Sequence, residues 1–224
     1  MVTDTLKFEE SNTSSSRHSH EDMMNGGFHA VLNCGNRSCD LVRVVGDWGL
    51  SSGFGEDGAA YDDYLIPKFF APALPLIESH DLCPGPVQDR IDMAAKIIFV
   101  DPSSAANRLR AATEALMDDQ GIPRKHLQGG SIADLALHRR IGKFKVAKPQ
   151  YADAADLLLA VKWIGNVGSH DDVLRIADVL EGVTFLDHAL ELIYDTSAEE
   201  IKRRAADVVS RKGVPADRFR RLPF

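Results

Sequence analysis

One segment of the chain gathers residues that could act on a phosphate or a hydroxyl group. It reads KWIGNVGSH over residues 162–170 and joins the two longest helical patterns of the sequence. The imidazole of His170 titrates near neutral pH, so it can move a proton on a ribose hydroxyl or a leaving oxygen. The Asn166 amide can orient such a group, and Lys162 or Arg110 can contact a phosphate and steady its negative charge.

The same segment also has a purely structural interpretation. In a turn between two helices, Gly165 or Asn166 would take the left-handed conformation that ends the first helix. Ser169 or Asp171 would then cap the next helix. This interpretation explains the small and polar residues of the segment, but it does not explain His170 or Trp163. Both interpretations stay open from the sequence alone.

The cysteines suggest a second kind of chemistry. Cys34 and Cys39 have four residues between them, and His80 with Cys83 could complete a tetrahedral zinc site. Such a metal would stabilise a glycine- and proline-rich region that has little core of its own. The alternative is three reduced thiols, as is usual in a cytosolic protein. We predict no cofactor and no metal, with zinc on these four residues as the alternative.

Composition and charge limit the class of protein. The chain has 224 residues, of which 44% are hydrophobic and 26% are charged, and this excludes wholesale disorder. No apolar run reaches the roughly 18 residues that span a bilayer, and the N-terminus lacks the apolar stretch of a secretory signal. We therefore expect a cytoplasmic protein without membrane contact.

The charge is unevenly distributed along the chain. The formal net charge is -7, with -3 on residues 1–25, +4 on residues 199–224 and -8 on residues 26–198. The overall sign argues against a protein coated in nucleic acid but leaves room for a local site. The basic end could contact an acidic partner or a phosphate backbone, or it could be a solvated helix face and tail.

Four segments are expected to position these residues. Residues 1–25 are polar and rich in serine, which predicts a mobile tail. Residues 26–86 predict a small β-hairpin around CGNRSC and then an extended Pro/Gly-rich connector, because prolines exclude a helix or a central strand. Residues 87–213 predict a domain of five or six helices, and residues 214–224 a basic tail. We expect Trp48 and Trp163 to be packing anchors.

Apolar residues recur at helical spacing through the helical domain. Asp101 before Pro102 is a strong helix start, because an acidic side chain can cap a helix whose first residue is proline. The stretch RIGKFKVAK is expected to be a solvated basic loop. The helices are predicted over residues 87–98, 102–121, 131–140, 149–165, 171 or 172 to beyond 193, and 197–213.

Four stretches together resemble a known bacterial family. They are CGNRSC, LPLIESHDLCPGPV, DPSSAANRLRAATEALMDDQGI and VKWIGNVGSHDDV, in this order. They resemble the family called domain of unknown function 4145, a branch of the HEPN superfamily (higher eukaryotes and prokaryotes nucleotide-binding). The resemblance covers about residues 28–196. It implies a mainly α, HEPN-like helical bundle and a homodimer in which the motif helices meet.

The resemblance also implies a function. Many HEPN proteins are metal-independent ribonucleases of toxin–antitoxin and phage-defence systems, with an Arg, a polar residue and then a His. Asn166 and His170 match the polar residue and the His, whereas Gly165 stands where the Arg is expected. We expect engagement of RNA or nucleotides in a bacterial defence or toxin-like system, with His170 as acid/base, Asn166 as orienting group and Lys162 or Arg110 on phosphate. The alternative is a non-catalytic dimerisation or protein-interaction module of a defence or restriction system, which the missing Arg favours.

Overall fold

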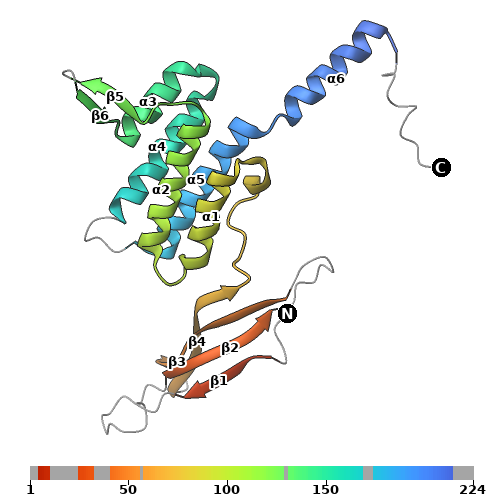
Figure 1. Cartoon of the computed structure of the whole chain (residues 1–224). Helices are drawn as coiled ribbons and strands as arrows, with labels where there is room; N and C mark the ends of the chain where they lie inside the picture. Colours follow the sequence, from red (N-terminus) through yellow and green to blue (C-terminus); the bar gives the residue numbers. More distant parts are fainter. Residues whose placement is uncertain are drawn as a thin grey trace.

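The structure is a computed structural model of the chain. It describes residues 5–10, 25–32, 41–55, 58–128, 131–168 and 174–213. An N-terminal β-sheet lies next to a bundle of helices, and the last helix stands away from the bundle (Figure 1). The described part of the chain is therefore mainly α with N-terminal strands, as the sequence predicts.

The N-terminal sheet has four antiparallel strands in the order β1-β2-β3-β4. The strands are β1 (Lys7–Glu10), β2 (Asn25–Leu32), β3 (Val42–Gly55) and β4 (Gly58–Ala71). The predicted hairpin partners on either side of CGNRSC pair as β2 and β3, while CGNRSC itself lies outside the described residues. Strand β1 falls within the expected mobile tail, so that expectation is wrong for Lys7–Glu10.

The expected extended connector is wrong over most of its length, because it forms β4 and most of β3. Pro67 is compatible with a strand because β4 lies at the sheet edge, where no outer ladder needs its missing amide hydrogen. The glycines of this segment suggested an irregular chain. In the sheet, however, a glycine leaves room for a side chain of the neighbouring strand. A Cβ on Gly49 would lie 2.5 Å from Cζ of Tyr64, so the ring of Tyr64 uses the space above the glycine.

The sheet buries a small apolar cluster of its own. Phe28, Ala30, Val44 and Trp48 are all buried, which confirms Trp48 as a packing residue. The sheet meets the bundle at Phe70, whose ring centroid lies 4.8 Å from that of Phe99. The connector proper is limited to the residues between β4 and the first short helix.

The helical bundle begins with a short 3₁₀ helix and contains a small hairpin. Helix α2 is central and packs against α1, α4 and α5, with Leu109, Leu116 and Leu158 fully buried between them. Its predicted start is confirmed, because the Ser104 amide donates to Asp101 Oδ1 at 2.8 Å. The elements are η1 (Ser79–Leu82), α1 (Gly85–Ile97), α2 (Pro102–Asp119), β5 (Lys125–Gln128), β6 (Ser131–Asp134), α3 (Leu137–Ala147), η2 (Pro149–Tyr151), α4 (Ala152–Val167), α5 (Ile176–Tyr194) and α6 (Ser197–Arg211).

The helix predicted over residues 131–140 is wrong. Residues 131–134 form β6, which pairs with β5, and α3 takes in most of the basic stretch that was expected to be a loop. The reason is visible in α3, where Leu137, Ile141 and Phe144 follow one another at helical spacing and are all buried.

The connector is attached to the bundle through α5. Asp187 accepts hydrogen bonds from the backbone amides of Glu78 and Ser79 at 3.1 and 3.0 Å. The Ser79 hydroxyl donates in turn to the carbonyl of Asp187 at 3.3 Å. These bonds hold η1 against α5. Within the described ranges, no helix combines the length and the apolar character needed to cross a membrane.

Candidate phosphate-binding site

Helix α4 continues through the segment for which the sequence offered a turn. Gly165 and Asn166 are helical, and the helix is capped at Gly168 with a right-handed φ of -62°. The predicted left-handed cap at Gly165 or Asn166 is therefore wrong. These glycines must have a different structural purpose.

Both glycines allow α4 to pack directly on α2. A Cβ on Gly165 would lie 2.6 Å from Cβ of Arg110 and 2.9 Å from the carbonyl oxygen of Ala106. A Cβ on Gly168 would lie 2.6 Å from the carbonyl oxygen of Ser103. Side-chain atoms essentially never approach so closely, so any residue larger than glycine would push the two helices apart.

This close packing brings two basic side chains together. Lys162 is only 6% exposed, and burial together with the charge of Arg110 lowers the pKa of its ammonium group. Arg110 Nη2 pairs with Oε1 of Glu114 at 3.0 Å, but its buried Nε has no hydrogen-bond partner. Lys162 makes no ion pair with any residue in the described ranges, and its Nζ lies 3.1 Å from the centroid of the Trp163 ring.

The arrangement suits an anion. Of the two cations only Arg110 pairs with a carboxylate, that of Glu114, so a phosphate oxygen would supply negative charge that this pair of cations lacks. An anion there would also favour the protonated form of Lys162, which its surroundings disfavour. The Trp163 ring is 56% exposed and offers a face on which a base could stack.

The structure thus brings together three of the four predicted site residues. Arg110 and Lys162 are close neighbours, and Asn166 lies one turn beyond Lys162 on the same side of α4. His170 lies outside the described residues. Trp163 was expected to be a packing anchor, and its exposure shows that this was wrong. The sequence could have predicted this exposure, because Trp163 falls outside the apolar stripe that contains Leu158 and Val161.

A comparison with protein families places this site in a known type of domain. Residues 92–212 match the model described as Domain of unknown function (DUF4145). The chain belongs to this family. Neither the curated proteins nor the solved structures contain a match to the chain. The DUF4145 match runs from within α1 through α6 and includes Arg110, Lys162 and Asn166.

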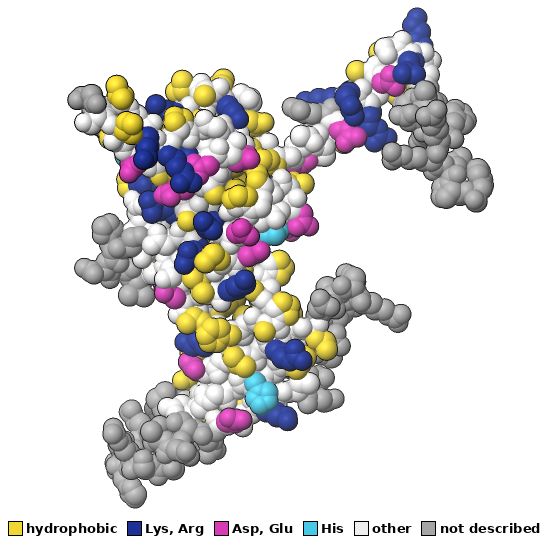
Figure 2. Space-filling view, viewed as in Figure 1, with side chains coloured by type: hydrophobic (Ala, Val, Ile, Leu, Met, Phe, Trp, Pro, Cys, Tyr) yellow, Lys and Arg dark blue, Asp and Glu magenta, His cyan; other side chains and the backbone are white. Residues whose placement is uncertain are grey.

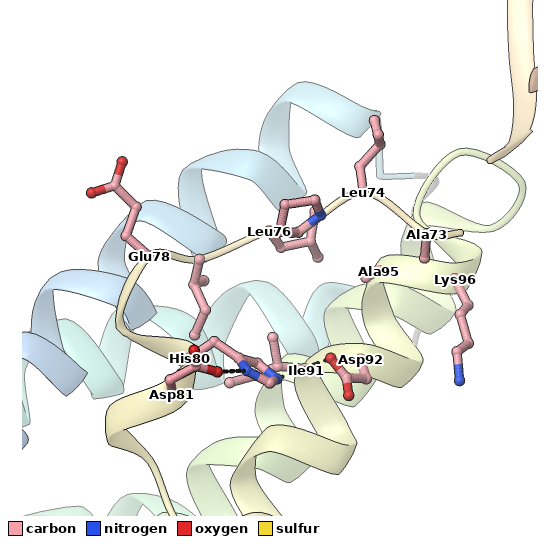
Figure 3. A pocket seen from close by; sticks show the side chains of 12 residues that line it. Ala73, Leu74, Leu76, Glu78, His80, Asp81, Ile91, Asp92, Ala95 and Lys96 are labelled. Atoms are coloured by element: carbon pink, nitrogen blue, oxygen red, sulfur yellow. Dashed lines mark hydrogen bonds and ion pairs between the residues drawn. The ribbon is translucent and has the colours of Figure 1, made fainter. Parts of the chain in front are cut away.

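Two of the four candidate zinc ligands of this DUF4145 protein, His80 and Cys83, are engaged in other contacts. His80 lies with Nδ1 3.1 Å from Asp81 and Nε2 3.0 Å from Asp92, so both ring nitrogens face carboxylates (Figure 3). The Cys83 thiol donates to the carbonyl of Ser79 at 3.2 Å, and burial raises its pKa to about 11, which disfavours the thiolate that zinc binds. Cys34 and Cys39 lie outside the described residues. The part of the chain that is described holds no cluster of three metal-ligating side chains.

The contacts of His80 predict a pH-dependent contribution to stability. Its hydrogen bond to Asp81 raises the pKa of His80 above 6.5, burial opposes this, and Asp92 adds to the rise. The protonated pair therefore stabilises the fold fully below pH 6.5 and loses its effect as the pH rises through the folded pKa. We expect His80→Gln to lower the free energy of unfolding more at about pH 6 than at about pH 8.5, by less than about 1 kcal/mol because the carboxylates are exposed.

Urea denaturation of the native chain and of the variant at both pH values measures this difference. His188→Gln is the matched control, because His188 also contacts a carboxylate, Glu191, at 3.0 Å but lies on exposed α5 surface. An equal loss at both pH values would show that His80 acts by packing alone.

Proposed function

We propose that this protein is a HEPN-like helical domain that binds the phosphate backbone of RNA or a nucleotide on its α2–α4 face. The observation that carries the proposal is the pair Arg110 and Lys162, two neighbouring cations of which only Arg110 has a carboxylate partner, Glu114. The exposed Trp163 next to them gives a base a surface for stacking.

The packing of α2 on α4 also supports the proposal that Arg110 substitutes for the arginine that the HEPN motif has and this chain lacks. In this chain Gly165 stands at the motif position, and the space that its side chain would enter is filled by the stem of Arg110. A guanidinium group from α2 therefore takes the role of one from α4. On this proposal, Asn166 orients the substrate and His170, beyond the end of α4, acts as acid/base.

The setting of this activity follows from the resemblance. HEPN proteins act in bacterial defence and toxin-like systems, commonly as homodimers, and we propose the same for this chain, in the cytoplasm. A non-catalytic interaction module is the second candidate. It is favoured by the packing of Gly165 and Gly168 on α2, which explains both glycines without any chemistry.

Ribonuclease activity without a metal ion is the outcome that we expect from the catalytic form of the proposal. A base that removes the proton from a ribose 2′-hydroxyl lets its oxygen attack the adjacent phosphorus, and the 5′-oxygen leaves with a proton from an acid. We expect native protein to cleave total RNA in EDTA, leaving cyclic phosphate ends, and His170→Ala to lose at least about a hundredfold in rate.

DNA of matched sequence is the substrate control, because it lacks the attacking hydroxyl and should stay intact. His138→Ala is the matched variant, since it removes a histidine in the first turn of α3, outside the segment 162–170. Equal cleavage by native protein and His170→Ala would exclude His170 from the chemistry. RNA binding without cleavage would keep the proposed binding and remove the catalytic step, whereas neither binding nor cleavage would favour the non-catalytic interaction module.

A further inference from the structure

Among its described side chains, helix α6 presents no face that packs against the rest of the described chain. It stands away from the bundle, and its surface carries a concentration of Lys and Arg side chains (Figure 2). Ile201 is 63% exposed and Val209 75% exposed, although both are large apolar residues. A helix of this length is only marginally stable in water without a partner. Its exposed apolar residues therefore indicate a surface that another element covers.

The side chains of α6 are arranged on two sides. Ile201, Ala205 and Val208 follow one another at helical spacing and form an apolar ridge. Arg204 and Arg211 lie along one flank of this ridge. Arg211 pairs with Asp207 at 2.6 Å, so Arg204 is the cation of this flank to which no ion pair is assigned in the described residues. A surface that covers α6 must therefore be apolar at its centre and acidic at its edge.

A groove with these properties lies between the connector and α1. It has a volume of about 380 Å³, and Figure 3 shows its side chains. Its apolar part includes Leu74, Leu76 and Ile91. Three carboxylates lie at its edge, those of Glu78, Asp81 and Asp92, with one lysine, Lys96. His80 contacts Asp81 and Asp92, so Glu78 is the carboxylate to which no ion pair is assigned in the described residues.

We infer that α6 of one copy of this chain docks in this groove of a second copy. The apolar ridge faces the apolar walls, and the basic flank faces the acidic edge. The overall charges agree, because residues 199–224 carry +4 and residues 26–198 carry -8. This inference gives an interface to the homodimer of the proposed function but does not depend on RNA binding, since the groove is lined by the connector and α1 and not by α2 or α4.

The second copy is the occupant because α6 is directed away from the body of its own chain. Its first turn is fixed by Asp195, whose carboxylate accepts from the amide and the hydroxyl of Ser197 at 2.7 and 3.0 Å. These bonds order only the start of α6, and the outward direction of the helix lets it reach a neighbouring molecule (Figure 1). A two-fold exchange lets each copy give one helix and receive one, which closes the assembly as a dimer.

Cross-linking between two differently tagged full-length chains tests the exchange directly. Both chains carry Cys34→Ser, Cys39→Ser and Cys83→Ala; one then carries Leu76→Cys and the other Val208→Cys. After mixing, a short thiol cross-linker is expected to join the two chains. The matched control replaces Val208→Cys by Val146→Cys, an 84% exposed valine on α3, and should give at least about tenfold less product.

Charge reversal tests the same contact in a cysteine-intact chain. Glu78→Lys and Arg204→Glu alter exposed side chains, so circular dichroism should show native helix content in both. Each single variant is expected to raise the dimer dissociation constant at least about tenfold, and the double variant to recover most of the loss. Sedimentation velocity measures all four proteins.

Three results would overturn the inference. Cross-linking only within a chain that carries both Leu76→Cys and Val208→Cys would show that α6 closes on its own groove. A dimer unaffected by Arg204→Glu and without the mixed cross-link would place the interface elsewhere. A monomer that binds vesicles containing phosphatidylserine, and loses this binding with Arg204→Glu, would assign α6 to an anionic membrane surface.

Discussion

The double variant Arg110→Gln/Lys162→Met is expected to bind single-stranded RNA at least about a hundredfold more weakly than the native chain. Each cation makes a charge-assisted contact worth about 1.5–3 kcal/mol, and about 1.4 kcal/mol corresponds to a factor of ten in affinity. The apolar stem of Gln keeps the contact with Gly165, and the Met thioether can lie against the Trp163 ring in place of the ammonium group. The loss therefore reports the charges and not the packing.

Fluorescence anisotropy with a labelled RNA at several salt concentrations measures both the affinity and its salt dependence. The slope of log affinity against log salt should become shallower by about one to two, since up to two phosphate contacts are removed. Arg108→Gln is the matched control, because Arg108 is exposed on the opposite side of α2. An equal loss in Arg108→Gln would mean that RNA binds through general charge and not at the α2–α4 face.

Gly165→Ala is expected to lower the free energy of unfolding by about 2 kcal/mol, even though alanine is the better helix former. The new Cβ would meet Cβ of Arg110 and the carbonyl oxygen of Ala106, and neither can move without shifting α2. The strain therefore exceeds the gain in helix propensity. The same shift would displace Arg110, so RNA affinity should fall with stability.

Gly142→Ala makes the same change in α3 with the opposite expected sign. Nothing lies within 4 Å of the Cβ that it adds, and the position is exposed. It should raise the free energy of unfolding by about 0.5–1 kcal/mol. Chemical denaturation of both variants gives the comparison. A stabilising Gly165→Ala would mean that α4 is not in close contact with α2.

Local signals in the sequence were sufficient where local interactions decide the structure. Asp101 and Pro102 mark the start of α2 because a helix cap is made by the residues next to it. The antiparallel pair around CGNRSC and the buried stripes of the long helices also follow from alternation and helical spacing.

The sequence misled where a distant part of the chain decides the conformation. Gly49 has the character of a loop residue, yet it lies in β3 because the Tyr64 ring of the next strand needs the space. Gly165 has the character of a helix end, yet it lies within α4 because α2 approaches it. The proximity of Arg110 and Lys162 follows from that approach, and no spacing along the chain reveals it.

The bonds of Asp187 join the residues matched by the family model to the connector that precedes them. Asp187 lies inside the matched residues 92–212, whereas its partners Glu78 and Ser79 lie before them. A fragment that starts at residue 92 would leave this carboxylate without two of its donors. It would also lack Val87 and Ile91, which fill the bundle core. The smallest piece of this chain that retains its full set of core contacts therefore includes the connector and all of α1.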